Sequence, residues 1–211
     1  MTRIKICGVT RIDDALRIAG LGVDFVGLNF WPQSKRYVAL DRGADIARHV
    51  RAAHPATQLV GVFVDPTIDD VVAHTAKANL DIVQLHGVET PELCAAIAHA
   101  VQRPVWKAIP VATSSDIADL TAWPVDAILL DAPSPGRGGA GLAFDHHLAK
   151  QAHVRHPGVR LVLAGGLNPT NVAAAVRLAT PWCVDVASGV ESAPGVKDPT
   201  KVAAFIAAVR S

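Results

Sequence analysis

Short apolar segments rich in β-branched residues alternate along the chain with longer segments in which apolar residues recur at helical spacing. This alternation predicts parallel strands joined by crossover helices. The predicted strands cover residues 3–8, 25–30, 58–64, 82–87, 105–111, 127–132, 160–166 and 183–189. The predicted helices cover residues 11–22, 41–53, 66–78, 90–101, 114–123 (the weakest pattern), 144–155, 169–179 and 198–210. Eight such units favour an α/β fold, a single (β/α)₈ TIM barrel over residues 1–211, with an open doubly wound sheet as the alternative.

Two of the segments that follow a predicted strand are long. One covers residues 31–40 after the second strand, and the other covers residues 133–144 after the sixth. In such barrels the loops after the strands build the active site at the carboxyl end of the barrel. The extra residues on that face therefore favour ligand binding over a purely structural role.

Polar residues occupy several positions that should face the inside of the barrel. Strand side chains alternate between the helices and the lumen, so the outward Ile4 and Ile6 direct Lys5 and Cys7 inward. The same rule directs inward a further set of polar residues: Asn29, Gln84, His86, Lys107, Asp131 and Asp185. Buried polar groups need partners, and a Lys5–Asp185 ion pair is one structural explanation.

The polar residues at strand ends are harder to explain structurally, because the barrel opens there. Cys7, His86 and Asp131 hold such positions. A small cysteine is common in protein cores, so Cys7 taken alone does not decide between core and site.

Glycines follow the seventh and eighth predicted strands. Gly165 and Gly166 end one strand, and Ser188 and Gly189 end the next. Glycine lets backbone N–H groups approach an anion, and in (β/α)₈ barrels these two loops frequently hold a phosphate. Two further glycines in the loop after the sixth strand add possible donors: Gly138 and Gly139. These positions predict a phosphorylated small-molecule substrate.

The composition indicates which partners and which cellular compartment to expect. The formal net charge is +1, which favours neither nucleic acid nor a membrane surface as a partner. Three cysteines make no disulfide framework and fit a reducing compartment. The chain has neither the apolar segment of a signal peptide nor a run of the roughly 18 apolar residues expected of a membrane helix. We expect a cytoplasmic protein, and the sequence leaves open whether it is a monomer or a homodimer.

An ordered set of motifs identifies the chain as a relative of a known family. It begins with KICG at residues 5–8 and ends with SGVESAPGVKD at residues 188–198. Between them lie NFWPQSKRYV, VGVFV, VQLHG, LLD, GGAGLAFD and LAGGLNPTNV. In these motifs the chain resembles the phosphoribosylanthranilate isomerase family. The resemblance implies an Amadori rearrangement of N-(5-phosphoribosyl)anthranilate to 1-(2-carboxyphenylamino)-1-deoxyribulose 5-phosphate in tryptophan biosynthesis, with no metal and no organic cofactor.

The resemblance also implies roles for individual residues. Cys7 of KICG would be the general base, Asp131 of LLD the general acid, and Arg36 of SKR a ligand of the anthranilate part. His86 and Asp185 are further substrate-binding candidates. The glycines and the serine after the last strands would bind the phosphate.

The chain departs from the family pattern at two positions. Ala140 stands where GGTG is common, and His146 stands where FDW is common. Both changes bear on substrate binding rather than on the acid or the base.

The proposed chemistry sets conditions on the acid and the base. Asp131 must have a pKa above the usual value of about 3.9 to donate a proton to the ring oxygen. A positive charge near Cys7, such as Lys5, should increase the thiolate fraction. The first and sixth strands are three positions apart in the ring, so Cys7 and Asp131 should face each other across the barrel mouth.

Two other classes of function remain open from the residues alone. A metal-dependent sugar-phosphate epimerase would need several His and Asp ligands at strand ends, and only His86 of the nine histidines qualifies. A non-catalytic sugar-phosphate-binding barrel would keep the glycine loops without needing an acid and a base. An isomerase that also accepts the histidine-pathway aminoaldose is expected to carry two aspartates, and Cys7 argues against it.

Overall fold

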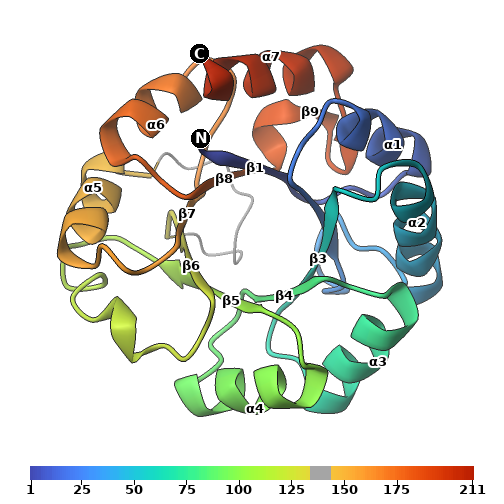
Figure 1. Cartoon of the computed structure of the whole chain (residues 1–211), viewed down its shortest axis with the longest axis horizontal. Helices are drawn as coiled ribbons and strands as arrows, with labels where there is room; N and C mark the ends of the chain where they lie inside the picture. Colours follow the sequence, from blue (N-terminus) through green and yellow to red (C-terminus); the bar gives the residue numbers. More distant parts are fainter. Residues whose placement is uncertain (134–143) are drawn as a thin grey trace.

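Eight parallel strands close into a barrel in the computed structural model, which describes residues 1–133 and 144–211 (Figure 1). Each strand pairs with the next one along the chain, and β1 pairs with β8 to close the ring. The strands are β1 (Arg3–Ile6), β2 (Phe25–Asn29), β3 (Gln58–Phe63), β4 (Ile82–Leu85), β5 (Val105–Pro110), β6 (Ala127–Asp131), β7 (Leu161–Leu163) and β8 (Cys183–Val186). The predicted TIM barrel is confirmed.

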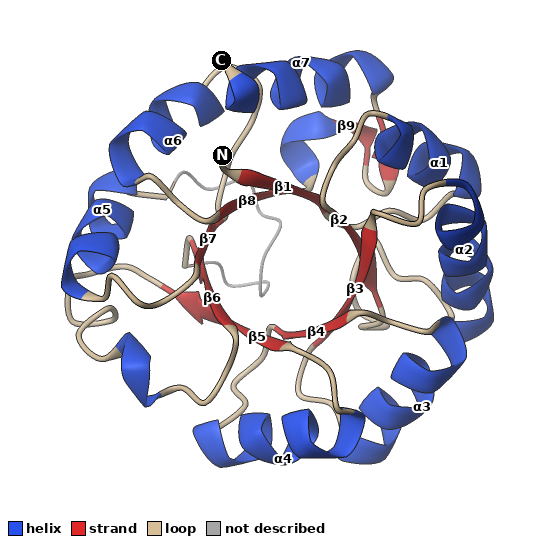
Figure 2. Cartoon of the chain, in the orientation of Figure 1, coloured by secondary structure: helices blue, strands red, loops and turns tan. Residues whose placement is uncertain are grey.

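Helices surround the barrel and cover its outer face (Figure 2). They are α1 (Ile12–Gly20), α2 (Leu40–Ala53), α3 (Ile68–Ala78), α4 (Pro91–Val101), α5 (His146–Arg155), α6 (Val172–Ala179) and α7 (Pro199–Arg210). Several begin where a side-chain oxygen caps the first turn, as the sequence indicates. Thr67 and Thr90 cap α3 and α4, and Asp198 accepts hydrogen bonds from two backbone N–H groups at the start of α7.

The prediction of a helix at 114–123 is wrong. Between β5 and β6 the structure has only a 3₁₀ turn, η1 (Leu120–Ala122). The side chain of Asp116 accepts hydrogen bonds from the backbone N–H groups of Ala112 and Thr113, and Asp119 accepts one from Ala122. Such bonds between side chain and backbone compete with helix formation.

The buried apolar residues form two separate layers. The larger layer lies between the barrel and the helices and includes Ile4 and Ile6. The smaller layer fills the lumen, where the Phe25 and Trp106 rings meet edge to face with centroids 5.0 Å apart. Trp182, just before β8, contacts both rings. Phe25 begins β2, so this aromatic cluster fills the amino-terminal end of the barrel, and the carboxyl end is left for a site.

A short hairpin follows β8 and was not predicted. It comprises η2 (Ser188–Val190), β9 (Glu191–Ala193) and β10 (Val196–Lys197), which pairs antiparallel with β9. Gly195 lies in the left-handed region at φ +79°, as a tight turn between the two strands requires. In the described part of the chain, no helix is long and apolar enough to span a membrane.

Candidate active site

The Cys7 thiol lies at the carboxyl end of β1, in space left by a glycine of the neighbouring strand. The Cys7 N–H donates to the carbonyl of Val186 at 2.8 Å, which continues the β1–β8 pairing by one residue. A Cβ at Gly27 would lie 2.8 Å from the Cys7 Sγ, closer than such atoms approach. Gly27 therefore makes the room in which this thiol lies.

The charges near Cys7 act in opposite directions. Burial raises the pKa of the Cys7 thiol, while the Lys5 ammonium lowers it and the Asp185 carboxylate raises it. Lys5 is fully buried, and its Nζ lies 2.9 Å from Asp185 Oδ2. Lys5 thus favours the thiolate as expected, but burial outweighs it, and the pKa of Cys7 is above its usual value.

Asp131 ends β6 on the lumen side, two residues after the lumen residue Leu129. Its Oδ1 accepts a hydrogen bond from the N–H of Ala132 at 2.9 Å, and its Oδ2 lies 3.3 Å from His86 Nε2. The side chain of Gln84 holds the other ring nitrogen of His86, with Nε2 3.0 Å from Nδ1. When the amide donates to Nδ1, the His86 proton is on Nε2 and points to Asp131.

Cys7 and Asp131 come from strands that β7 and β8 separate in the closed ring. Both side chains alternate with residues of the outer apolar layer, Ile6 and Leu130, so neither turns toward the helices. The two groups therefore belong to the same mouth of the barrel, at the carboxyl ends of their strands.

Arg36 joins the site from the loop after β2. Its guanidinium forms a two-pronged ion pair with Glu191, with Nε 2.8 Å from Oε1 and Nη2 2.7 Å from Oε2. This hydrogen bonding raises the pKa of Arg36. The Arg36 stem packs on Gly8, where a Cβ would collide with the Arg36 Cδ, and Gly8 has φ +71°. Gly8 thus brings Arg36 next to Cys7.

The glycines after β7 and β8 pack tightly. Gly165 and Gly166 have φ values of +81° and +69°, and a Cβ at Gly165 would lie 2.7 Å from the Ala132 nitrogen. A Cβ at Gly189, which follows Ser188 in η2, would collide with the Leu167 carbonyl. The two loops therefore lie against each other, and Gly165 also borders Asp131. Gly138, Gly139 and Ala140 fall outside the described residues.

One inward prediction is wrong. Lys107 alternates with Trp106 and Ala108, which both face the lumen, so Lys107 faces outward. Its Nζ lies 2.9 Å from Glu89 Oε2 and 2.8 Å from the Gly87 carbonyl. The bulky indole of Trp106 takes the lumen position, and the ammonium finds a buried carboxylate instead.

Comparison with known proteins shows the family of the chain. Residues 4–208 match the family described as N-(5'-phosphoribosyl)anthranilate (PRA) isomerase. The chain belongs to the phosphoribosylanthranilate isomerase family. Two isomerases of this name, from Myxococcus xanthus and Magnetococcus marinus, are 44% and 45% identical over 99% of this chain and over 96% and 95% of their own lengths.

Solved structures of phosphoribosylanthranilate isomerases superpose closely. The Thermotoga maritima isomerase is 38% identical with a TM-score of 0.90, covering 100% of this chain and 99% of its own. Another, solved in complex with reduced 1-(o-carboxyphenylamino)-1-deoxyribulose 5-phosphate, is 37% identical with a TM-score of 0.87 and the same coverage. The metal-dependent epimerase is not supported, and residues 1–133 and 144–211 contain no group of three or more potential metal ligands.

Three features near the isomerase site were not predicted from the sequence. They are the pairing of His86 with Asp131 and the buried charges of Glu191 and Lys197. The last two belong to the motif at residues 188–198, in which the sequence predicts a phosphate-binding role only for Ser188 and Gly189. At the position that departs from the family, His146 begins α5, and burial lowers its pKa.

Proposed function

We propose that this chain isomerises N-(5'-phosphoribosyl)anthranilate with Cys7 as the general base and Asp131 as the general acid. Aldose–ketose isomerisation of that compound, in tryptophan biosynthesis, is the activity of the family to which the chain belongs. The observation that carries the two assignments is the placement of both groups on the lumen side at the carboxyl ends of β1 and β6. A sugar over the mouth has one group on each side.

The proton transfers follow from this placement. Asp131 protonates the ring oxygen as the bond from that oxygen to C1 breaks, which leaves an iminium at C1. The iminium makes the proton on C2 acidic, and Cys7 removes it to give an enolamine. The enolamine takes up a proton at C1 and releases the proton of its C2 hydroxyl, which gives the ketose. The positive iminium also favours the thiolate, against the burial that raises the pKa of Cys7 in the unliganded site.

His86 supports the acid in this proposal. Its Nε2 lies 3.3 Å from Asp131 Oδ2, so the imidazole holds the carboxyl group in place at the mouth of the barrel. Gln84 fixes the imidazole ring from behind. His86 also lies at the mouth, where it remains within reach of the substrate.

The remaining candidates bind the substrate in this proposal. Arg36 binds the anthranilate carboxylate, and the loops with Gly165, Gly166, Ser188 and Gly189 bind the phosphate, together with Gly138 and Gly139. Asp185 uses Oδ2 for Lys5, while its buried Oδ1 has no hydrogen-bond partner among the described residues. A buried acceptor of this kind suits a substrate hydroxyl.

The proposal also covers the domain organisation, the compartment and the cofactor requirement of the protein. We infer that residues 1–211 form one domain, that the protein acts in the cytoplasm on a phosphorylated small molecule, and that it needs no cofactor.

The test is the turnover of Cys7→Ala and Asp131→Asn, followed through the loss of fluorescence of the anthranilate conjugate. We expect each variant to fold and to lose about 10²–10⁴-fold in kcat. Full activity in either variant would show that its residue is not the acid or the base. Binding of a substrate analogue by the wild type without any turnover would favour the non-catalytic barrel.

A further inference from the structure

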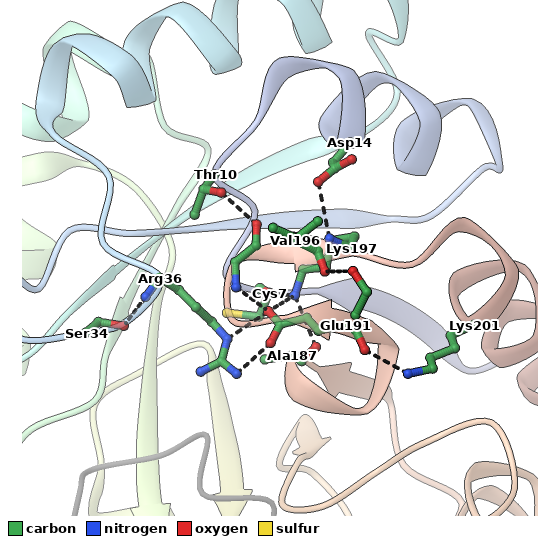
Figure 3. A network of polar contacts seen from close by, with 12 residues as sticks. Cys7, Thr10, Asp14, Ser34, Arg36, Ala187, Glu191, Val196, Lys197 and Lys201 are labelled. Atoms are coloured by element: carbon green, nitrogen blue, oxygen red, sulfur yellow. Dashed lines mark hydrogen bonds and ion pairs between the residues drawn. The ribbon is translucent and has the colours of Figure 1, made fainter.

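Three charged side chains meet beside Cys7, and two of them, Glu191 and Lys197, are buried (Figure 3). Glu191 in β9 binds the Arg36 guanidinium and also accepts a hydrogen bond from Lys197 Nζ at 2.8 Å. The same Nζ donates to the carbonyl oxygens of Cys7 at 2.6 Å and of Ala187 at 3.1 Å. Lys197 is 4% exposed and Glu191 is 8% exposed.

The hairpin that carries these residues is fixed to the helices on both sides. The backbone N–H of Lys197 donates to Asp14 of α1 at 3.2 Å. Lys201 of α7 donates from Nζ to the Glu191 carbonyl at 2.8 Å. A surface hairpin does not need a buried lysine, and burying an ammonium costs free energy unless it is paired. The position of Lys197 therefore calls for an explanation within the site.

We propose that Glu191 and Lys197 are positioning residues of the isomerase: Glu191 orients the Arg36 guanidinium, and Lys197 holds the main chain of Cys7. This inference rests on the proposed function, because it takes Cys7 as the base and Arg36 as the ligand of the anthranilate carboxylate.

The contacts of Arg36 show what this orientation does. Glu191 binds the Nε–Nη2 edge of the guanidinium, so the Nη1–Nη2 edge is directed away from it. Guanidinium edges match carboxylates through two parallel hydrogen bonds. Glu191 therefore leaves Arg36 with one edge of the correct geometry for the carboxylate of anthranilate.

The charges of the cluster also affect Cys7. Lys5, Lys197 and Arg36 are the cations that face the thiol, and Asp185 is the facing anion. Glu191 neutralises one of the two positive charges on Arg36 and Lys197, so these three side chains together keep one net positive charge. That charge favours both the thiolate and the carboxylate of the substrate.

The experiment measures the reactivity of the Cys7 thiol separately from the binding and turnover of the substrate. Alkylation of Cys7 by iodoacetamide is followed across pH by mass spectrometry of the peptide that contains it, because Cys94 and Cys183 are also free thiols. The variants are Glu191→Gln, Glu191→Asp and Lys197→Met. Lys201→Met is the matched control, since Lys201 contacts Glu191 only through the backbone carbonyl. For each variant, kcat and KM are measured with the anthranilate conjugate.

The charge-changing variants should shift alkylation in opposite directions. Glu191→Gln adds one net positive charge and should speed alkylation at neutral pH, whereas Lys197→Met removes one and should slow it. A shift of half a pKa unit corresponds to about threefold in each direction. Lys197→Met should also lower kcat. Glu191→Asp keeps the charge but shortens the side chain, so KM should rise about tenfold or more while alkylation stays unchanged. Lys201→Met should match the wild type.

A purely structural role predicts a different pattern. Alkylation shifts of the same sign in Glu191→Gln and Lys197→Met, an equal shift in Lys201→Met, or an unchanged KM in Glu191→Asp would overturn the proposal. If Lys197→Met does not fold, the two Glu191 variants carry the test. A fully active Cys7→Ala enzyme would instead show that Cys7 is not the base. The alkylation shifts test the positioning proposal separately, because they do not depend on turnover.

Discussion

Gly27→Ala should displace the Cys7 thiol, which we propose as the base, without requiring a strained φ at residue 27 itself. Gly27 does not have a positive φ, so an alanine can adopt the same backbone conformation. The added Cβ would lie 2.8 Å from Cys7 Sγ and 3.0 Å from Cys7 Cα. Because such contacts are favourable only from about 3.5 Å, Sγ must move by roughly 0.7 Å.

Two effects follow from that displacement. Misplacing a reacting group by about 1 Å can cost about 100-fold, so kcat should fall by roughly 10- to 100-fold, with a smaller change in KM. Overpacking should lower the free energy of unfolding by about 1–3 kcal/mol, which lowers Tm by roughly 2–4 °C per kcal/mol in a chain of this length.

The assays are steady-state turnover by fluorescence and thermal unfolding by circular dichroism. Gly158→Ala is the matched control, because a Cβ there meets nothing within 4 Å. In a Cys7→Ala background, Gly27→Ala should cost less stability, since the Sγ is gone. The reasoning fails if Gly27→Ala behaves like Gly158→Ala, or if its stability cost is the same with and without the Cys7 sulfur.

Two further predictions concern the buried ion pairs. Lys107→Met should lower the free energy of unfolding by about 3–5 kcal/mol in urea titrations, because it leaves Glu89 buried without its cation; a cost near zero would refute the pairing. Burial alone would raise the pKa of Glu191, but Arg36 and Lys197 lower it below the usual 4.5. The stability that Glu191 contributes is therefore complete above pH 4.5 and lost as pH falls through its lower folded pKa, so Glu191→Gln should flatten the loss of stability in acid. Parallel pH–stability curves for Glu191→Gln and the wild type would contradict this.

The sequence was sufficient to predict the barrel and most inward positions. Regular alternation of strand and helix patterns indicates parallel strands, and the alternation of side chains placed Lys5, Asp131 and Asp185 correctly. The same rule failed at Lys107, because it treats every apolar strand residue as outward. The lumen also needs apolar filling, and Trp106 supplies it.

What the sequence could not predict depends on local hydrogen bonds in one case and on distant contacts in the others. Asp116 and Asp119 replace a helix by local hydrogen bonds, which the apolar pattern does not reveal. The Lys197–Cys7 contact joins residues 190 positions apart, and no periodicity reports such a pair. The pairing of His86 with Asp131 likewise depends on the stagger of β4 against β6.

The hydrogen bond from Lys197 to Cys7, together with the pairing of β1 and β8, has a consequence for synthesis of the protein. Translation adds Cys7 to the growing chain well before the partners of its main chain, Val186 and Lys197, and Lys197 lies 190 positions further along. Contacts of such long sequence separation form late in folding. The thiol therefore emerges from the ribosome well before it can reach its folded position, so a chain that ends before Val186 carries Cys7 without the contacts that fix its main chain.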